Sequence, residues 1–184
     1  MQPSARCLRV KWRTVQTGGG NLEAEAEAAF EQFYRKHERR VGRLVLGMLG
    51  DPALAADAAQ ETWLRYLRYV DRPEPHLDES LLLAVARNVV RTVLRRHRPE
   101  VLASCDGRSD PAAFEEALLM ADLVRHLPYH EREVVVLRYA LDMPLDAICR
   151  LLHAPSGTVK SRLHRARLHL REAYLAGEGA RRHA

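Results

Sequence analysis

Apolar side chains recur at helical spacing along almost the whole of this 184-residue chain, and glycine or proline residues separate the segments that show the pattern. A recurrence every three to four residues is typical of an α-helix with one face on a hydrophobic core. The pattern predicts helices over residues 21–49, 52–70, 77–97, 112–127, 130–140, 144–153 and 155–175. The run "VVVLRY" (134–139) has strand propensity, but its neighbours are helical and no partner strand is visible. The sequence therefore predicts an all-α fold.

Two stretches without this pattern divide the chain. Residues 1–20 end in three consecutive glycines and are interpreted as a flexible arm. Residues 99–111 are rich in Pro, Ser, Asp and Gly, as linkers are. We therefore expect two small helical domains, 21–98 and 112–177, joined by a flexible linker at 99–111 and followed by a polar tail at 178–184.

The composition argues against several classes of function. The three cysteines lie far apart, which fits a reducing compartment better than a disulfide framework or a zinc site. Pro128 breaks the helix that a metal site at His126 and His130 would need, so no metal is expected. No other cofactor is expected either. No nucleophile–base pair, phosphate-binding loop or pair of carboxylates indicates an enzyme. Without an apolar run of about 18 residues or the apolar core of a signal peptide, we expect a cytoplasmic protein with no membrane partner.

The segment "PLDAICRLLHAPSGTVKSRLHRAR" has the pattern of a helix-turn-helix. Apolar stripes mark a short helix and a longer one on either side of the tight turn "HAPS": Leu145, Ile148 and Leu152, then Val159, Leu163, Ala166 and Leu170. The rest of the longer helix is mainly basic, which together with the net charge of +5 favours a polyanion such as DNA. The candidates for contacts with DNA bases or phosphates are Ser156, Thr158, Lys160, Ser161 and Arg162, with Arg165 and Arg167 suited to the flanking DNA backbone.

Two other interpretations of this helix stay open from its own residues. A basic helix face can simply be solvated, and a basic amphipathic helix can lie on a membrane surface. The short helix and the turn in front of it disfavour the first interpretation. The lack of Trp or Phe on its apolar face disfavours the second.

The first domain carries two more surfaces that a hydrophobic core does not explain. Arginines recur on one side of the helix predicted over 77–97, beside Asn88 and without an acidic residue between them: Arg87, Arg91, Arg95 and Arg98. In the helix predicted over 52–70, a core stripe leaves a second stripe that is polar except for one leucine: Asp57, Gln60, Glu61, Leu64 and Arg68. The core stripe itself consists of Ala55, Ala59, Trp63, Tyr66 and Val70. One basic face in each domain indicates a single long anion that contacts both, and DNA fits this description.

These segments resemble a known family. "LPYHEREVVVLRYALDMPLDAICRLLHAPSGTVKSRLHRARLHLRE" is similar to the C-terminal DNA-binding domain of bacterial RNA polymerase sigma factors of the extracytoplasmic-function (ECF) group, within the sigma-70 family. "FEQFYRKHERRVGRLVLGMLGDPALAADAAQETWLRYLR" and "AVARNVVRTVLRRHR" resemble the N-terminal conserved domain of the same family. The resemblance covers about residues 25–98 and 112–175.

The resemblance implies a role for each surface. The residues Asp57, Gln60, Glu61 and Leu64 would dock on the clamp helices of the largest subunit of core RNA polymerase, with the polymerase flap as a further contact. The residues Arg87, Asn88, Arg91 and Arg95 would read and melt the promoter −10 element, and the last helix would read the −35 element. An anti-sigma factor is an expected partner of such a protein. The chain departs from the family at Leu81, where an aromatic residue is common, at Thr92, where an acidic one is, and at Ala147, where glutamate is.

Two alternative functions can be compared with promoter recognition. A sigma-like mimic that sequesters an anti-sigma factor would be free to lose its DNA-binding charge, whereas both basic faces are present here. Mimics also usually carry a fused receiver domain, and the chain has no α/β pattern. A stand-alone helix-turn-helix repressor would leave the second stripe of the helix at 52–70 unexplained. The sequence thus favours a sigma factor.

Overall fold

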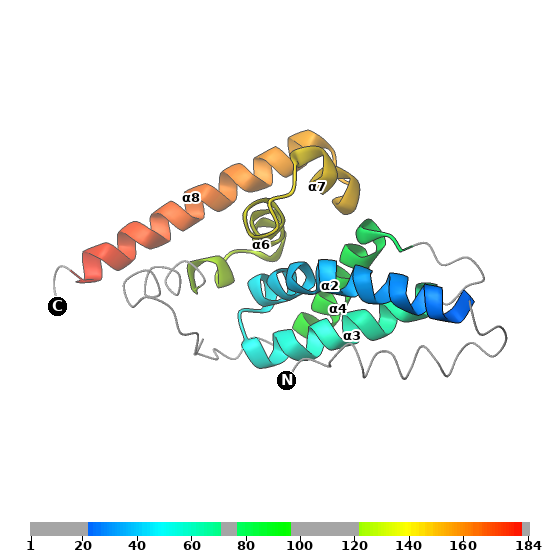
Figure 1. Ribbon diagram of the computed structural model, residues 1–184. Helices are drawn as coiled ribbons and strands as arrows, with labels where there is room; N and C mark the ends of the chain where they lie inside the picture. Colours follow the sequence, from blue (N-terminus) through cyan, green and yellow to red (C-terminus); the bar gives the residue numbers. More distant parts are fainter. Residues whose placement is uncertain (1–21, 71–76, 97–121, 182–184) are drawn as a thin grey trace. The chain divides into compact units, whose positions relative to one another are not determined.

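The computed structural model describes residues 22–70, 77–96 and 122–181, with side chains from residue 27 to residue 176, and all elements in these ranges are helical (Figure 1). They are α2 (Leu22–Leu49), α3 (Pro52–Val70), α4 (Glu79–Arg96), α6 (Tyr129–Val135), the π-helical turn η1 (Val136–Ala140), α7 (Leu145–Leu152) and α8 (Ser156–Arg181). The all-α prediction is confirmed, and residues 134–139 are helical. The predicted arm, the predicted linker, Arg98 and most of the helix predicted over 112–127 lie outside the described residues.

The helices group into two compact units. The first unit contains most of α2 and α3 together with α4. The second contains α6, η1, α7 and α8. The second unit also includes residues 46–52, at the end of α2 and the start of α3. The predicted domain bounds, 21–98 and 112–177, stay a prediction.

An aromatic cluster joins α2 to α3 in the first unit. The ring of Trp63 lies 4.7 Å from that of Tyr34 and 6.2 Å from that of Phe30, and Phe33 stacks on Tyr66 at 5.5 Å between ring centroids. Aromatic side chains bury large areas and pair in such offset or edge-on geometries. Periodicity alone predicted the core positions Trp63 and Tyr66, which are buried, and Phe30 is buried beside them.

The boundary between α2 and α3 follows the predicted glycine and proline. Gly50 has a φ of 71°, and its N–H donates to the carbonyl of Leu46 at 2.8 Å. A left-handed residue after a helix is favourable mainly for glycine, because it has no Cβ. Helix α3 then begins at Pro52, whose ring fixes a helical φ and whose missing N–H would have no partner in the first turn.

Three side chains fix the start of α4. The carboxylate of Asp78 accepts the backbone N–H groups of Ser80 at 2.8 Å and Leu81 at 3.4 Å, which caps the helix. The phenol of Tyr66 on α3 accepts the N–H of Asp78 at 2.8 Å and donates to its carbonyl at 3.1 Å. On α2, Arg40 pairs with Glu79 at 2.6 Å. The first turn of α4 is therefore held by both neighbouring helices.

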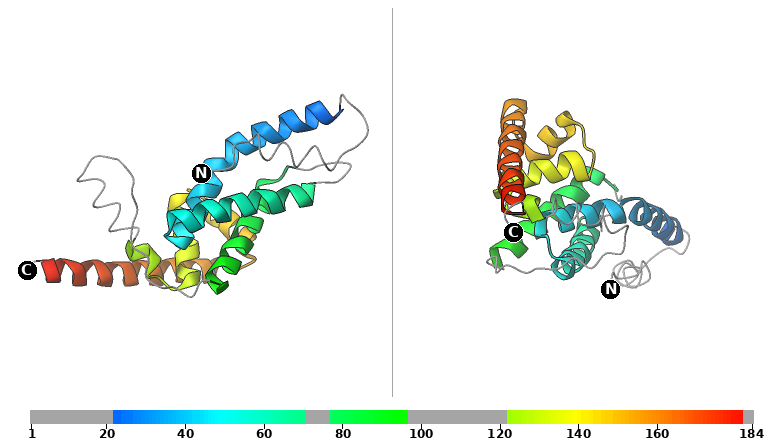
Figure 2. Two further views of the ribbon diagram at one scale, coloured as in Figure 1. Left: turned by 90° about the horizontal axis from the view of Figure 1, so that it is seen from below. Right: turned by 90° about the vertical axis from the view of Figure 1, so that its left-hand side faces the viewer.

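In the second unit, α6 and α7 both pack on α8. The turn between α7 and α8 places His153 at a φ of 49°, and Ala154 donates its N–H to the carbonyl of Cys149 at 3.1 Å. The buried side chains of this unit come from all of its elements and include Val134, Leu137, Ile148, Val159, Leu163 and Ala166. The predicted helix-turn-helix is confirmed. Figures 1 and 2 show α8 as one long, straight helix that continues past α6 and α7.

Two helix ends differ from the prediction. The helix predicted over 130–140 is α-helical only to Val135, and the π-helical turn η1 follows. In η1 the N–H of Leu141 donates to the carbonyl of Val136 at 3.1 Å, and Asp142 then takes a left-handed φ of 51°. Helix α8 extends to Arg181, beyond the predicted end at 175, because the glycines of the sequence "GEGARRHA" do not interrupt it.

Candidate nucleic-acid and polymerase interfaces

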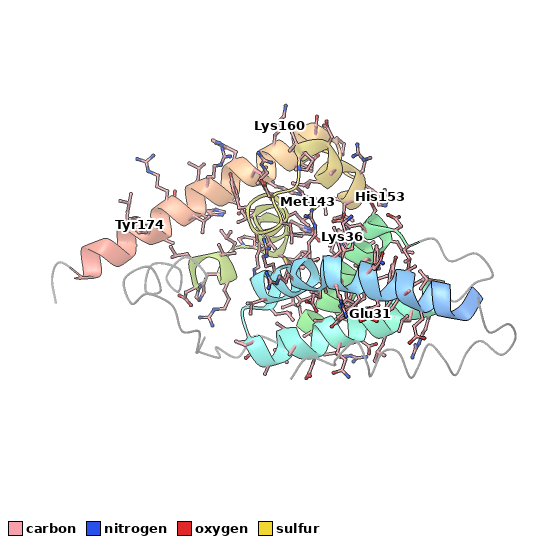
Figure 3. All side chains as sticks on the ribbon, in the orientation of Figure 1. Glu31, Lys36, Met143, His153, Lys160 and Tyr174 are labelled. Carbon is pink, nitrogen blue, oxygen red and sulfur yellow. The ribbon has the colours of Figure 1, made fainter. Side chains whose placement is uncertain are left out.

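Helix α8 is fixed on its unit by one narrow apolar stripe. Val159, Leu163 and Ala166 are buried, and Leu170 is half-buried. Of the predicted DNA-contacting residues on this helix, Thr158 and Arg162 are half-buried and the others are exposed: Ser156, Lys160, Ser161, Arg165 and Arg167. Figure 3 shows the side chain of Lys160 pointing away from α6 and α7. The stripe thus holds the helix in place while its polar circumference stays accessible.

A row of four cationic or imidazole side chains runs along one side of α8. Its members are Lys160, His164, Arg167 and Arg171, all exposed. Their spacing of four, three and four residues places them on one face of a helix. His164 and Arg171 were not among the predicted residues, although this spacing is visible in the sequence. We call these four residues the cationic row.

The two arginines predicted to touch the DNA backbone are held on opposite sides of α8. Arg165 lies 3.9 Å from the carboxylate of Glu131 on α6, and His169, one turn further on, donates from Nδ1 to the same carboxylate at 2.6 Å. Arg167 instead donates from Nε and Nη2 to the phenol oxygen of Tyr139 on η1, at 3.1 and 2.7 Å. Neither Glu131 nor Tyr139 was predicted to matter, because no pattern in the sequence pairs elements so far apart.

The first turn of α8 is open to an approaching partner. Apart from its chain neighbours and the backbone of its own helix, no atom of the described protein would lie within 4 Å of a Cβ built on Gly157. The hydroxyl of Ser161 donates to the carbonyl of Thr158 at 3.0 Å, so its oxygen can still accept a hydrogen bond. Small and short polar side chains therefore border the exposed end of the helix.

Helix α4 presents only part of its predicted basic face. Asn88, Arg91 and Arg95 are exposed, whereas the side chain of Arg87 is buried, with 8% of the residue exposed. The hydroxyl of Thr92 donates to the carbonyl of Asn88 at 2.9 Å. Arg87 therefore differs from the expectation that all these residues share one exposed side. The reason is that α4 buries a wide arc of its surface, from Leu82 through Val90 to Arg87, rather than one narrow stripe.

Helix α3 has the two faces that its sequence predicts. Its core stripe, from Ala55 to Val70, is buried. On the other face Asp57 and Gln60 are exposed, while Glu61 and Leu64 are half-buried. Glu61 accepts the Nε–H of Arg65 at 2.6 Å. Tyr69, which is 52% exposed, lies near the end of the same helix and was not singled out in the sequence.

Within the described ranges, four side chains have shifted pKa values, and none of them is among the predicted contact residues. In the first unit, burial raises the pKa of Tyr66 to about 12 and also raises the pKa of Tyr34, while burial lowers the pKa of His37. In the second unit, burial lowers the pKa of the Arg132 guanidinium. These shifts belong to the core rather than to a reactive centre. The residues described here also contain no group of three or more His, Cys, Asp and Glu side chains placed to hold a metal ion.

The sequence matches two models of protein families, each over one part of the chain. Residues 33–100 match sigma-70 region 2, and residues 117–170 match sigma-70 region 4. The ECF RNA polymerase sigma factor SigE of Mycolicibacterium smegmatis is 32% identical over 176 residues, which cover 87% of this chain and 68% of SigE. The chain belongs to the ECF group of the sigma-70 family.

As an ECF sigma factor, the protein directs transcription initiation and is not an enzyme. The region 2 match contains α3 and α4, and the region 4 match contains the helix-turn-helix. Of the helices in the described part of this sigma factor, none is both long enough and apolar enough to cross a membrane.

Two solved structures share the fold of this sigma factor. CnrH in complex with the cytosolic domain of CnrY aligns with a TM-score of 0.64 at 21% identity, over 91% of this chain and 97% of that one. The sigma factor RpoE of Bartonella quintana, in complex with the anti-sigma factor NepR, aligns with a TM-score of 0.61 at 19% identity, over 79% of this chain and 96% of that one. At these identities the likeness concerns the fold.

Proposed function

We propose that this sigma factor binds core RNA polymerase through one face of α3 and reads two promoter elements, one through α4 and one through α8. The observation that carries the proposal is the cationic row on a helix that a buried stripe fixes to its unit. A rigid helix with an exposed basic side suits the major groove of DNA. The other two surfaces lie on the part of the chain that matches sigma-70 region 2.

The polymerase contact is assigned to Asp57, Gln60, Glu61 and Leu64. A purely solvated face does not require a leucine, and Leu64 is half-buried in the middle of this polar surface. A partial apolar anchor surrounded by polar groups is the usual composition of a protein interface. The partner is the clamp-helix region of the largest polymerase subunit, with the polymerase flap as the proposed contact of the second unit.

The −10 element is assigned to Asn88, Arg91 and Arg95 on α4. Their exposed side chains supply an amide for base edges and guanidinium groups for phosphates. In this proposal Arg87 does not contact DNA. Its buried side chain packs under α4 and stabilises the helix. The fixed start of α4, held by Tyr66 and Arg40, keeps this surface in place.

The −35 element is assigned to the exposed side of α8. Ser156, Lys160 and Ser161 lie near its start, where base edges are within reach of a helix in the major groove. Thr158 and Arg162 are half-buried and border this surface. Arg165 and Arg167, further along the helix, suit the phosphates that flank the element.

The partners and the compartment follow from the same proposal. Core polymerase and promoter DNA place the protein in the bacterial cytoplasm. An anti-sigma factor is a further proposed partner, since the similar structure of RpoE contains the anti-sigma factor NepR.

In vitro transcription tests this function directly. Start sites mapped after overexpression would supply a promoter, and purified sigma factor with core polymerase should give a run-off transcript from it. Gln60→Ala should weaken binding to core polymerase, and Lys160→Ala should weaken promoter binding without affecting core binding. Matched controls on α2 are the exposed Gln32→Ala and Lys36→Ala, which should behave as the wild type. A protein that binds neither core polymerase nor promoter DNA would refute the proposal.

A further inference from the structure

Tyr139 and Arg167 meet on the surface of the second unit, although they come from different helices. Arg167 donates from Nε at 3.1 Å and from Nη2 at 2.7 Å to the phenol oxygen of Tyr139. Both residues are exposed, Tyr139 to 55%. A tyrosine hydroxyl has two lone pairs and one hydrogen. Because the guanidinium occupies both lone pairs, the phenol has only its hydrogen left to offer.

We propose that Tyr139 and Arg167 form one composite site for a phosphate oxygen of the DNA backbone beside the −35 element. The phenol O–H and the N–H groups on Nη1 that point away from Tyr139 are all donors, and the guanidinium adds a full positive charge. A ligand for such a site must supply only acceptors and a negative charge, as a phosphate does. The inference rests on the proposed function, because it requires α8 to lie on DNA.

The position of Arg167 along α8 fits this ligand. Arg167 belongs to the cationic row and follows Lys160 by seven residues, which is about 10 Å along the helix axis. The major groove is about 12 Å wide. When the start of α8 reaches base edges, a group about 10 Å further along the helix lies near the sugar–phosphate wall of the groove. The site is therefore suited to hold the helix in register rather than to read a base.

The π-helical turn gives Tyr139 its position. Val136 and Leu137 of the same turn are buried, whereas Tyr139 is exposed beside α8. The turn is secured by the bond from Leu141 to Val136 and by Arg138, whose Nη1 donates to the carbonyl of Met143 at 2.9 Å. Single π-helical turns are rare and occur often at functional sites. The phenol is thus placed before DNA arrives and limits the freedom of the long arginine side chain.

Binding of the polymerase holoenzyme to a promoter tests the site. We expect Tyr139→Phe and Arg167→Gln each to lower affinity by about 3- to 10-fold. The double variant should be little weaker than Arg167→Gln alone, because the two residues act as one unit. Arg167→Gln should also reduce the slope of log affinity against log salt concentration by about 0.9, the value for one phosphate. Tyr69→Phe is the matched control for an exposed phenol and should bind as the wild type.

Neutral methylphosphonates, placed one at a time along the flanking backbone, locate the ligand. One position, or two adjacent ones, should weaken wild-type binding and leave the double variant unaffected. If Tyr139→Phe binds as tightly as the wild type, or if every methylphosphonate weakens both proteins equally, the inference is wrong. Lys160→Ala distinguishes a failure of the composite site from a failure of the proposed function. If Lys160→Ala weakens promoter binding while the Tyr139 and Arg167 variants do not, the composite site is wrong and the proposed function stands. If none of these variants weakens promoter binding, the composite site and the proposed function are both wrong.

Discussion

Oε2 of Glu131 accepts a hydrogen bond from Nδ1 of His169 at 2.6 Å, and only 7% of Glu131 is exposed. The bond ties the first turn of α6 to the part of α8 that follows Ala166, the last fully buried residue of its apolar stripe. Arg165 approaches the same carboxylate at 3.9 Å. A buried carboxylate thus fixes the side of α8 opposite to the one that Tyr139 holds.

This bond predicts a loss of stability when the carboxylate is removed. Glu131→Ala should lower the free energy of unfolding by about 1–3 kcal/mol, because a buried acceptor is lost and His169 is left without it. Urea unfolding followed by circular dichroism measures the change. The exposed Glu172→Ala on α8, the helix of His169, should have almost no effect. Equal midpoints for Glu131→Ala and the wild type would contradict the structural role.

Two glycines with open space around them predict different effects of an alanine substitution on promoter binding. Alanine stabilises a helix interior by about 0.5–1 kcal/mol relative to glycine. Apart from chain neighbours and the backbone of the same helix, no atom of the described protein lies within 4 Å of a Cβ built on Gly42 or Gly157. Both Gly42→Ala and Gly157→Ala should therefore raise stability, Gly157→Ala by less because it lies near a helix end.

Only Gly157→Ala should weaken promoter binding, by about 3- to 10-fold. Its added methyl group would lie between the helix and the floor of the groove, whereas Gly42 lies on α2. Thermal melts and holoenzyme binding to a promoter duplex check the two effects on the same samples. Tight binding by Gly157→Ala would mean that this glycine does not closely approach DNA.

The burial of Arg87 predicts that its variants behave differently from those of its neighbours. Arg87→Ala should lower the free energy of unfolding by about 1–3 kcal/mol, because the packed stem and the polar contacts of a buried arginine are lost. Arg91→Ala and Asn88→Ala, at exposed positions, should change stability by less than about 0.5 kcal/mol. Denaturant titration distinguishes the two classes.

Promoter opening provides the second readout for these variants. Permanganate footprinting of the −10 region should show less melting with Arg91→Ala and Asn88→Ala at unchanged protein stability. If Arg87→Ala is as stable as the wild type and also fails to open the promoter, Arg87 contacts DNA after all. A supporting role would then be excluded.

The buried phenol of Tyr66 predicts a loss of stability in alkali. Burial raises the pKa of Tyr66 to about 12, above its usual value of 10.0, and the bond to the Asp78 backbone partly opposes this rise. The folded state therefore holds the proton more tightly than the unfolded state. The resulting stabilisation is complete below pH 10 and is lost as the pH rises from 10 towards 12, and it amounts to about 2–3 kcal/mol.

Urea unfolding between pH 8 and about 12 measures this dependence. Tyr66→Phe should be less stable at neutral pH, because its two bonds to Asp78 are lost, but should lose less stability in alkali than the wild type. Tyr69→Phe, at an exposed position, should follow the wild-type curve. Identical pH profiles for the wild type and Tyr66→Phe would contradict the assignment.

Features set by local sequence could be predicted, and those set by contacts between helices could not. The buried stripe of α8 and the boundary at Gly50 and Pro52 follow from spacing and backbone preference alone. The placement of Arg87 does not, because a helix packed against two neighbours buries more of its circumference than a single stripe. The bond from Arg167 to Tyr139 joins residues 28 positions apart, and the sequence contains no sign of the π-helical turn that makes it.

The number of residues in the π-helical turn also affects whether an arginine at position 167 has a bonding partner. Deleting one residue between Val136 and Tyr139 would let the segment continue as an ordinary α-helix and would move the tyrosine side chain to another position around the helix axis. The phenol would then no longer lie beside α8, and the arginine at position 167 would lose the group that orients it. Among related sigma factors, chains one residue shorter at this turn should therefore also have lost the tyrosine–arginine pair.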